Sequence, residues 1–218
     1  MTRSLMRFGA LLLAGALALE TGPATLQAQR SVPPNIVIIL ADDMGYGDIG
    51  SFGSPNIRTP RLDRMASEGQ KWTNFYVQPV CSPSRAALLT GRLPIRSGMY
   101  GIAGRIAPKV FLDNAAQGLP PQEVTLAEVL KPRGYATAII GKWHLGHLPQ
   151  FLPMAQGFDY WFGLPFSHDM RMTVPRDKGL KTAAYYDPKP EYWDVPLMRN
   201  GDVIEKTGGS SHTDTALY

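Results

Sequence analysis

The 218-residue sequence has one cysteine, few charged residues and no block of basic residues. Charged residues make up 18% of the chain and hydrophobic residues 44%, which is typical of a folded globular protein and excludes a disordered one. The formal net charge of +4 is spread along the chain, so the basic footprint of a nucleic-acid-binding protein is absent. A single cysteine, Cys81, also excludes a disulfide within the chain.

No hydrophobic run reaches the ~20 residues that a transmembrane helix needs, so we expect no stable membrane span. The apolar run 8–19 follows Arg3 and Arg7 and is followed by small residues, which is typical of a secretory signal peptide. We therefore expect residues 1–28 to be a signal peptide and residues 29–218 to be exported. A buried helix or a membrane anchor is the alternative interpretation of the run.

Three segments of the mature chain have the composition of strands. Residues 35–41 (NIVIILA) form a continuous aliphatic run, which is typical of a parallel strand covered on both faces. Residues 72–77 and 135–140 are shorter and rich in aromatic or β-branched side chains. We predict a strand at each of the three.

Helices are predicted between these strands. Thr59 can cap a helix that has Pro60 at its first position and ends at Gly69. Thr125 and Glu128 form a capping box that opens a second helix. The alternation of strands and helices predicts an α/β fold with a mostly parallel central sheet between helix layers.

Polar residues follow two of the predicted strands directly. Asp42 and Asp43 come after the strand 35–41, and Lys142 and His144 come after the third strand. Ligands of open α/β sheets bind at the carboxyl ends of the strands, so these residues are candidates for one site. Adjacent carboxylates suit a hard divalent cation, whereas a solvated acidic turn is the alternative for the aspartate pair alone.

The segment 81–92 combines a nucleophile position with an anion-binding one. Pro83 suits the first turn of a helix and Gly91 its end, so Cys81 lies at the N-terminus, where the helix dipole favours negative charge. Arg85, one turn later, can point back and bind an oxyanion through its planar guanidinium. The alternative is that Cys81 is an ordinary buried thiol.

Residues 81–92, CSPSRAALLTGR, match the sulfatase signature C-x-P-S-R-x-x-x-L-T-G-R at every specified position. Four more segments resemble sulfatase blocks in the expected order: PNIVIILADDMGYGD, TPRLDRMASEG, GKWHLG and QGFDYWFGLPFSHD. The sequence thus resembles the sulfatase family, and its last two blocks resemble the branch of arylsulfatase A and N-acetylgalactosamine-6-sulfatase. The resemblance implies an alkaline-phosphatase-like fold.

The resemblance also implies a covalent modification of Cys81. A maturation enzyme that reads Cys81, Pro83 and Arg85 would convert the cysteine to formylglycine. One hydroxyl of the hydrated aldehyde would attack sulfur and expel the alcohol of the substrate, leaving a covalent sulfate ester on residue 81. Loss of the proton of its second hydroxyl would then eject sulfate, a step that serine lacks.

By the same resemblance, a divalent cation would bind Asp42, Asp43 and an oxygen of the modified Cys81. Calcium is the implied ion, with magnesium as the alternative. The cation would orient the nucleophile and offset the charge of the sulfate oxygens. Arg85 would hold the formylglycine and the metal-binding carboxylates.

Three further residues are implied at the sulfate. Lys142 would contact both the formylglycine and the sulfate, and would stabilise developing charge. His144 would hydrogen-bond the diol or assist proton transfer. Ser167 matches a serine close to the bound sulfate in the arylsulfatase A branch, although an ordinary loop residue is the alternative there.

The implied reaction is hydrolysis of an aryl or carbohydrate sulfate monoester by a sulfuric ester hydrolase. A phosphonate or phosphodiester hydrolase of the same superfamily and an inactive truncated remnant are the alternatives. Sulfated small molecules or glycans are the expected substrates. The expected location is periplasmic or secreted, or lysosomal in a eukaryote.

Sulfatases are considerably longer than this chain, and their second half supplies an Asp-Asn metal pair with another His and Lys. No such pair follows Ser167 in this sequence. We therefore expect residues 29–218 to be the N-terminal part of a sulfatase domain and to be inactive alone. Four aromatic residues are candidates for an aryl or sugar pocket or for the core: Trp143, Trp161, Phe162 and Phe166.

Overall fold

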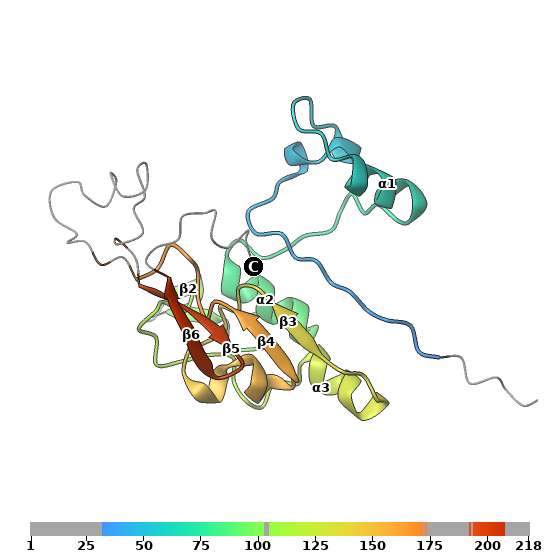
Figure 1. The fold of residues 1–218 in the computed structure, drawn as a ribbon. Coiled ribbons are helices and arrows are strands. Elements are labelled where there is room, and N and C mark those ends of the chain that lie inside the picture. Colours follow the sequence, from blue (N-terminus) through green and yellow to red (C-terminus); the bar gives the residue numbers. More distant parts are fainter. Residues whose placement is uncertain (1–31, 103–104, 172, 174–191, 193, 208–218) are drawn as a thin grey trace, which may run out of the picture. The chain divides into compact units, whose positions relative to one another are not determined.

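The computed structural model describes residues 32–102, 105–171, 173, 192 and 194–207 (Figure 1). The expected signal peptide, residues 1–28, lies outside them. The chain divides into two compact units, Met1–Ala41 and Asp42–Tyr218. All elements of regular structure described below belong to the second unit.

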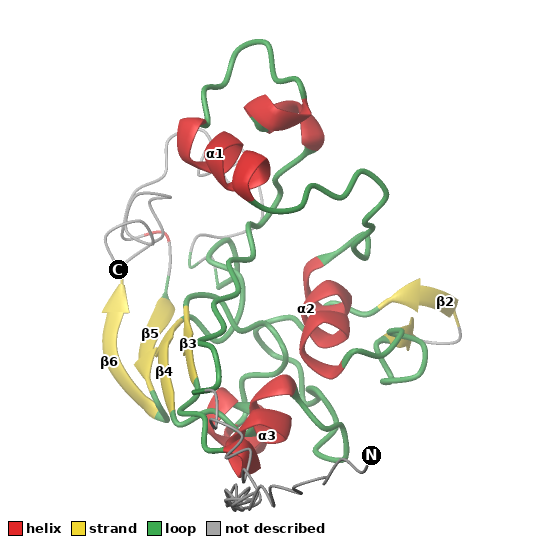
Figure 2. Cartoon of the chain, turned by 90° about the vertical axis from the view of Figure 1, so that its right-hand side faces the viewer, coloured by secondary structure: helices red, strands yellow, loops and turns green. Residues whose placement is uncertain are grey.

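Strands β3 to β6 form a four-stranded sheet and lie side by side in Figure 2. Their order is β3-β4-β5-β6; β3 and β4 pair in parallel, and the other two pairs are antiparallel. Strands β1 and β2 form a separate antiparallel pair. The strands span Tyr100–Ile102 (β1), Arg105–Pro108 (β2), Ala138–Ile140 (β3), Tyr160–Gly163 (β4), Val195–Arg199 (β5) and Asp202–Thr207 (β6).

The α/β class is confirmed, but the described sheet is mixed rather than mostly parallel. Two of its three strand pairs are antiparallel, β4–β5 and β5–β6. The second of these pairs is joined by a tight turn, where Asn200 has a φ of 56° and Gly201 follows it. An Asn-Gly sequence is common in short hairpin loops, and such a loop makes the flanking strands antiparallel. Strands β3 and β4 pair in parallel, which the long connection between them allows.

Two of the predicted strands are wrong. Residues 35–41 and 72–77 have no strand pairing, and both are exposed along their length. A strand requires a hydrogen-bonded neighbour, and no described residue supplies one to either segment. The third prediction, 135–140, is confirmed only for its last three residues, in β3.

Both predicted helices are confirmed at their starts. Helix α1, Pro60–Glu68, has Thr59 as its N-cap and ends before Gly69. Helix α3, Leu126–Leu130, begins with the predicted capping box, in which Thr125 and Glu128 each accept a hydrogen bond from the other's backbone N–H. The remaining helices are α2, Cys81–Thr90, and the 3₁₀ turns Tyr46–Asp48, Gly50–Phe52, Lys131–Arg133, Pro149–Phe151 and Pro153–Gln156. Among the described residues, no helix has the length and apolar character that crossing a membrane requires.

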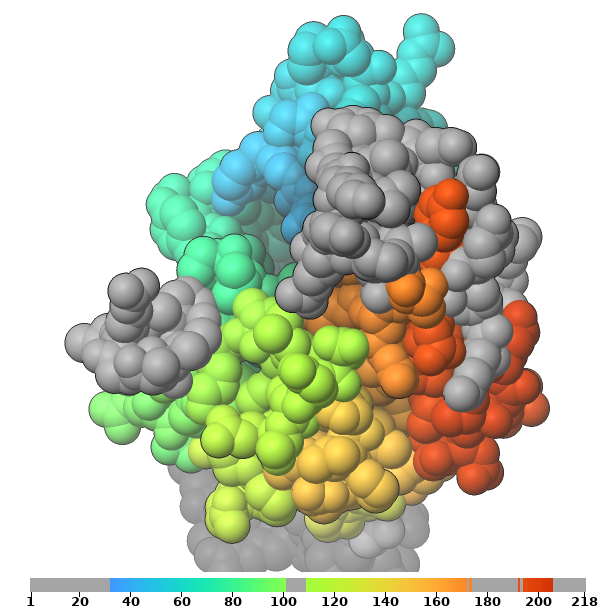
Figure 3. Space-filling view, turned by 90° about the vertical axis from the view of Figure 1, so that its left-hand side faces the viewer, coloured from blue at the N-terminus to red at the C-terminus, as the bar shows by residue number. Residues whose placement is uncertain are grey.

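The main hydrophobic core packs α2 against the loops that carry the candidate site. Ala86 of α2 is fully buried against residues such as Phe111, Leu145 and Trp161. Figure 3 shows the surface near residues 110–120 beside that near 145–151. Gly118 allows this approach, because a Cβ there would lie 2.6 Å from the carbonyl oxygen of Leu145.

Three of the four candidate pocket aromatics belong to the core. Trp143 and Trp161 are buried in the main cluster, and Phe166 is buried in a second, smaller one. Phe162 is half-buried, and the Arg199 guanidinium lies 5.7 Å from the centre of its ring. The core interpretation is therefore correct for Trp143, Trp161 and Phe166.

Candidate active site

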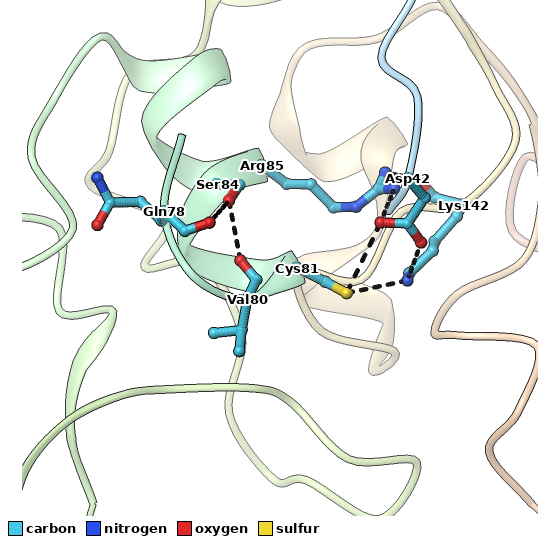
Figure 4. A network of polar contacts seen from close by, with 7 residues as sticks. All are labelled: Asp42, Gln78, Val80, Cys81, Ser84, Arg85 and Lys142. Atoms are coloured by element: carbon cyan, nitrogen blue, oxygen red, sulfur yellow. Dashed lines mark hydrogen bonds and ion pairs between the residues drawn. The ribbon is translucent and has the colours of Figure 1, made fainter. Parts of the chain in front are cut away.

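Helix α2 begins at Cys81, as the sequence predicts, and ends at Gly91, which has a φ of 65°. The segment that leads into the helix is fastened by Ser84, whose Oγ lies 2.9 Å from the carbonyl oxygens of both Gln78 and Val80 (Figure 4). The Cys81 side chain is thereby held in the first turn, where free backbone N–H groups face outward from the helix end. This end of the helix favours a negatively charged group.

Three of the candidate residues, Asp42, Arg85 and Lys142, meet beside Cys81 (Figure 4). Lys142 Nζ lies 2.6 Å from Asp42 Oδ2 and 3.1 Å from Cys81 Sγ. Asp42 Oδ1 in turn lies 3.8 Å from Cys81 Sγ and 3.8 Å from an Nη atom of Arg85. Segments that are far apart in the sequence thus place one carboxylate and two cations around a single sulfur atom.

Arg85 also holds the backbone of this site together. Its other Nη donates a hydrogen bond to the carbonyl oxygen of Lys142, which joins α2 to the loop after β3. Its Nε is buried and has no hydrogen-bond partner among the described residues. A buried donor without a partner is costly, so this N–H is available to an incoming acceptor.

Burial and charge act in opposite directions on the two charged partners. Burial alone would raise the pKa of Asp42, but the hydrogen bond and charge of Lys142, together with the charge of Arg85, outweigh it and hold the pKa below its ordinary value. Burial lowers the pKa of Arg85, against the opposing effect of Asp42. Both groups are nonetheless charged at neutral pH, because the Asp42 shift favours ionisation and a guanidinium is protonated far above pH 7.

His144 is buried and neutral. Burial, aided by the nearby charge of Lys142, lowers its pKa to about 4. Its Nε2 lies 2.9 Å from the carbonyl oxygen of Phe111, and since a carbonyl only accepts, Nε2 must carry the proton. Nδ1 then bears a lone pair, and it has no hydrogen-bond partner among the described residues.

The low pKa of His144 predicts a loss of stability in mild acid. The unfolded histidine titrates near 6.5 and the folded one near 4, so between these values only the unfolded chain takes up the proton. The stabilisation is complete above pH 6.5 and declines as the pH falls toward 4, by about 2 kcal/mol at pH 5.

Urea unfolding of the wild type and of His144→Asn at pH 7.5 and pH 5 measures this contribution. Asparagine suits position 144 because the backbone there has a φ of 58°. The wild type should lose about 2 kcal/mol more than the variant between the two pH values. Equal losses would show that His144 is protonated in the folded protein at pH 5.

The remaining two candidates lie outside the network. Asp43 is exposed and adopts a φ of 60° beside Asp42. Ser167 is buried in the loop after β4, two residues beyond Pro165, whose carbonyl oxygen accepts a hydrogen bond from the backbone N–H of His144. The structure thus places Ser167 in the segment adjoining the Lys142–His144 loop, but it records no contact between Ser167 and Cys81.

The two aspartates offer oxygen ligands of the kind that a hard divalent cation prefers. They lie next to each other in the chain, and Asp42 reaches the Cys81 side chain. Among the described residues, no group of three or more His, Cys, Asp or Glu side chains is placed to hold a metal ion. A cation bound here would need further oxygen donors or water.

Sequence reasoning missed two contributors to the site. Phe111 orients His144 through a backbone carbonyl, so its side chain carries no signal for that role. Ser82 lies within the signature, but at a position that the signature does not specify. Its side chain is uncharged, and the hydrogen bond it makes is with the backbone N–H of Phe111.

Comparison with known proteins agrees with the arrangement around Cys81. A family model described as Sulfatase matches residues 34–202. The chain is 55% identical over 137 residues to N-acetylgalactosamine-6-sulfatase of Sus scrofa, covering 62% of this chain and 26% of that protein. It is 53% identical over 156 residues to arylsulfatase A of Homo sapiens, covering 70% of this chain and 28% of that protein.

Solved structures are similar to the chain as well. The crystal structure of Ps i-CgsB superposes with a TM-score of 0.62 at 32% identity, covering 83% of this chain and 39% of that one. The crystal structure of the PsFucS1 sulfatase from Pseudoalteromonas sp. superposes with a TM-score of 0.58 at 36% identity, covering 81% and 36%. The chain spans about a quarter of the length of the two curated relatives described above. On its sequence match, its fold and the residues gathered around Cys81, this chain belongs to the sulfatase family.

Proposed function

We propose that the whole protein hydrolyses sulfate monoesters, and that position 81 supplies the nucleophile. The observation that carries this proposal is the environment of Cys81: the first turn of α2, with Lys142 Nζ 3.1 Å from its sulfur and Arg85 on the next turn. A helix N-terminus and two cations around one side chain suit a reaction in which negative oxygens gather. Family membership supports sulfate as the group that is transferred.

The nucleophile in this proposal is formylglycine, produced from Cys81 by a maturation enzyme that reads Cys81, Pro83 and Arg85. In its hydrated form this group supplies a hydroxyl that attacks sulfur. The motif is intact in this chain, and Cys81 is only partly buried, as a residue that another enzyme must reach should be. Lys142 and Arg85 are both oriented by ion pairs with Asp42, so they can stabilise the oxygens without rearranging.

A divalent cation completes the proposal, with calcium as the first candidate and magnesium as the second. Asp42 and Asp43 would hold it, together with an oxygen of the modified residue 81. When bound, such an ion offsets negative charge on sulfate oxygens. The support is the chemistry of these donors, because paired carboxylates are the ligands that hard cations prefer.

His144 and Ser167 have separate proposed roles. The neutral His144 offers a lone pair on Nδ1, so it can accept a hydrogen bond or a proton from a hydroxyl at the site. Ser167, in the adjoining loop, would contact the sulfate of the substrate. Both roles depend on the loop contact between His144 and Pro165.

The substrate in this proposal is a sulfated small molecule, either an aryl sulfate or a carbohydrate sulfate. The names of the relatives support both classes, since they include an arylsulfatase and an N-acetylgalactosamine-6-sulfatase. Export through the N-terminal segment 1–28 would bring the protein to such substrates in the periplasm or outside the cell. In a eukaryote, the lysosome is the corresponding compartment.

Two measurements test the proposal on the gene product expressed together with a formylglycine-generating enzyme. Mass spectrometry of the peptide that contains position 81 should show loss of sulfur and gain of an aldehyde. Turnover of an aryl sulfate should appear only in protein modified in this way. An intact thiol in the competent host would overturn the proposed nucleophile.

Competing substrates test which group is transferred. Aryl sulfate, aryl phosphonate and phosphodiester are supplied at equal concentration, and each product is quantified. The proposal expects kcat/KM to be highest for the sulfate ester. Preference for the phosphonate or diester would identify a related hydrolase, and no turnover of any ester by modified protein would identify an inactive remnant; either result contradicts sulfate hydrolysis.

A further inference from the structure

A buried serine connects the nucleophile helix to His144 through one residue of backbone. Ser82 lies in the first turn of α2, next to Cys81, and its side chain is inaccessible to solvent. Its Oγ accepts a hydrogen bond from the backbone N–H of Phe111 at 3.3 Å. The carbonyl oxygen of Phe111 in turn accepts the hydrogen bond from His144 Nε2 at 2.9 Å.

The two hydrogen bonds lie on opposite sides of the Phe111 α-carbon. The N–H side is fixed by Ser82 and the carbonyl side by His144, while the Phe111 side chain is anchored in the main core. Phe111 lies outside any helix or strand, so no regular pattern of hydrogen bonds orients its carbonyl. The Ser82 hydroxyl therefore supplies the orientation that secondary structure provides elsewhere.

The orientation of that carbonyl decides which nitrogen of His144 is free. The ring is neutral, so one nitrogen carries a proton and the other a lone pair. Lys142 and Arg85 disfavour a proton on the ring, and only Asp169 among the charged groups acting on it favours one. Because the ring is neutral, the Phe111 carbonyl selects the tautomer that has the proton on Nε2 and the lone pair on Nδ1.

We propose that Ser82 is a positioning residue for His144: acting through the backbone of Phe111, it holds the histidine in the tautomer that leaves Nδ1 free to accept. The proposal rests on the proposed function, in which His144 accepts a hydrogen bond or proton. It gives the unspecified second position of the signature a task in this chain, beyond filling space in the helix.

The test replaces Ser82 with alanine and reads the His144 tautomer by ¹⁵N NMR of histidine-labelled protein. The His144 signals are assigned by their absence in His144→Asn. In the wild type, Nε2 should have the shift of a protonated nitrogen and Nδ1 that of an unprotonated one. In Ser82→Ala the two shifts should move toward each other, because both tautomers become populated.

Matched variants separate the effect of the Ser82 hydroxyl from the effect of side-chain volume. Ser82→Thr keeps the hydroxyl and should retain the wild-type signals, whereas Ser82→Val has the shape of threonine without it and should behave as Ser82→Ala does. Ser97→Ala is the control, because Ser97 is equally buried and its hydroxyl binds only the carbonyl oxygen of Pro94. Unchanged His144 signals in both Ser82→Ala and Ser82→Val would overturn the proposal.

Kinetics provide the second measurement. Because Ser82 lies inside the maturation motif, turnover is divided by the fraction of protein that mass spectrometry finds modified at position 81. The corrected kcat of Ser82→Ala should fall about tenfold with KM little changed, and Ser82→Thr should restore it. An unchanged corrected kcat in Ser82→Ala would overturn the catalytic consequence of the proposal.

The two measurements fail independently. The NMR spectra are recorded on protein that still has the Cys81 thiol, so they need neither maturation nor a substrate. Altered tautomers in a protein without sulfatase activity would support Ser82 as a positioning residue and overturn the proposed function. Active wild-type enzyme with unaltered tautomers in the variants would support the proposed function and overturn Ser82 as a positioning residue.

Discussion

Replacing Cys81 with serine should give a protein that accepts sulfate once and does not release it. In the first turn of α2 the serine hydroxyl would lie near Lys142 and Arg85, as the thiol does now. It can form a sulfate ester there, but it lacks the second hydroxyl whose deprotonation would expel sulfate. Steady-state turnover should therefore fall by a factor on the order of 10³ or more.

The trapped ester is the measurement for Cys81→Ser. After incubation with an aryl sulfate, intact-protein mass spectrometry should find one added sulfate group, and phenol release should stop after one equivalent. Cys81→Ala is the control, because it has no oxygen to sulfate and should show neither signal. Sustained turnover by Cys81→Ser, or an adduct on Cys81→Ala, would place the nucleophile elsewhere.

Replacing Lys142 with methionine should have the second-largest effect. Lys142 Nζ contacts both Asp42 and the Cys81 side chain, and its own side chain is largely buried. Methionine keeps much of the length but removes the charge, so negative oxygens at position 81 lose their nearest cation. We expect kcat to fall by about 10² to 10³ with a smaller change in KM.

Lys131→Met is the matched control for Lys142→Met. Lys131 also forms an ion pair with an aspartate, Asp159, at 2.8 Å, but this pair is exposed and lies outside the network around Cys81. Its loss should leave kcat unchanged, since exposed ion pairs contribute little. Equal kcat values for the two variants, each corrected for modification at position 81, would show that Lys142 has no catalytic role.

The Lys142 variant should also change the pKa of its partner, Asp42. The hydrogen bond and the charge of Lys142 are the strongest of the effects that lower the pKa of Asp42. Without them, burial should raise that pKa, so the cation proposed to bind Asp42 should be held more weakly by the variant as the pH is lowered.

Local signals in the sequence were sufficient for the helices. Thr125 and Glu128 mark a helix start by reciprocal hydrogen bonds, and Thr59 with Pro60 marks another by the preference of proline for the first helical position; the structure has both helices there. Pro83 and Gly91 likewise bound α2. These features are predictable because the atoms that cap a helix belong to the same short segment.

Strands were predicted less well, because their stability depends on distant partners. The run 35–41 has the composition of a buried strand, yet it pairs with no described residue. Strand β6 was missed although an Asn-Gly turn precedes it, and its pairing with β5 is one of the two antiparallel pairs in the mixed sheet. Composition gives the preference of a segment, but only a neighbouring strand supplies its hydrogen bonds.

The sequence by itself determined the family, and it predicts position 81 as the nucleophile, because both rest on contiguous motifs such as CSPSRAALLTGR. It also placed the two cations correctly beside Cys81, since strand ends and helix starts of an α/β fold converge. Only the tertiary structure decided that Asp42 is paired with Lys142 and that His144 is neutral with Nδ1 free. The physical reason is that charge and protonation depend on burial and on partners such as the Phe111 carbonyl, whose position no local pattern encodes.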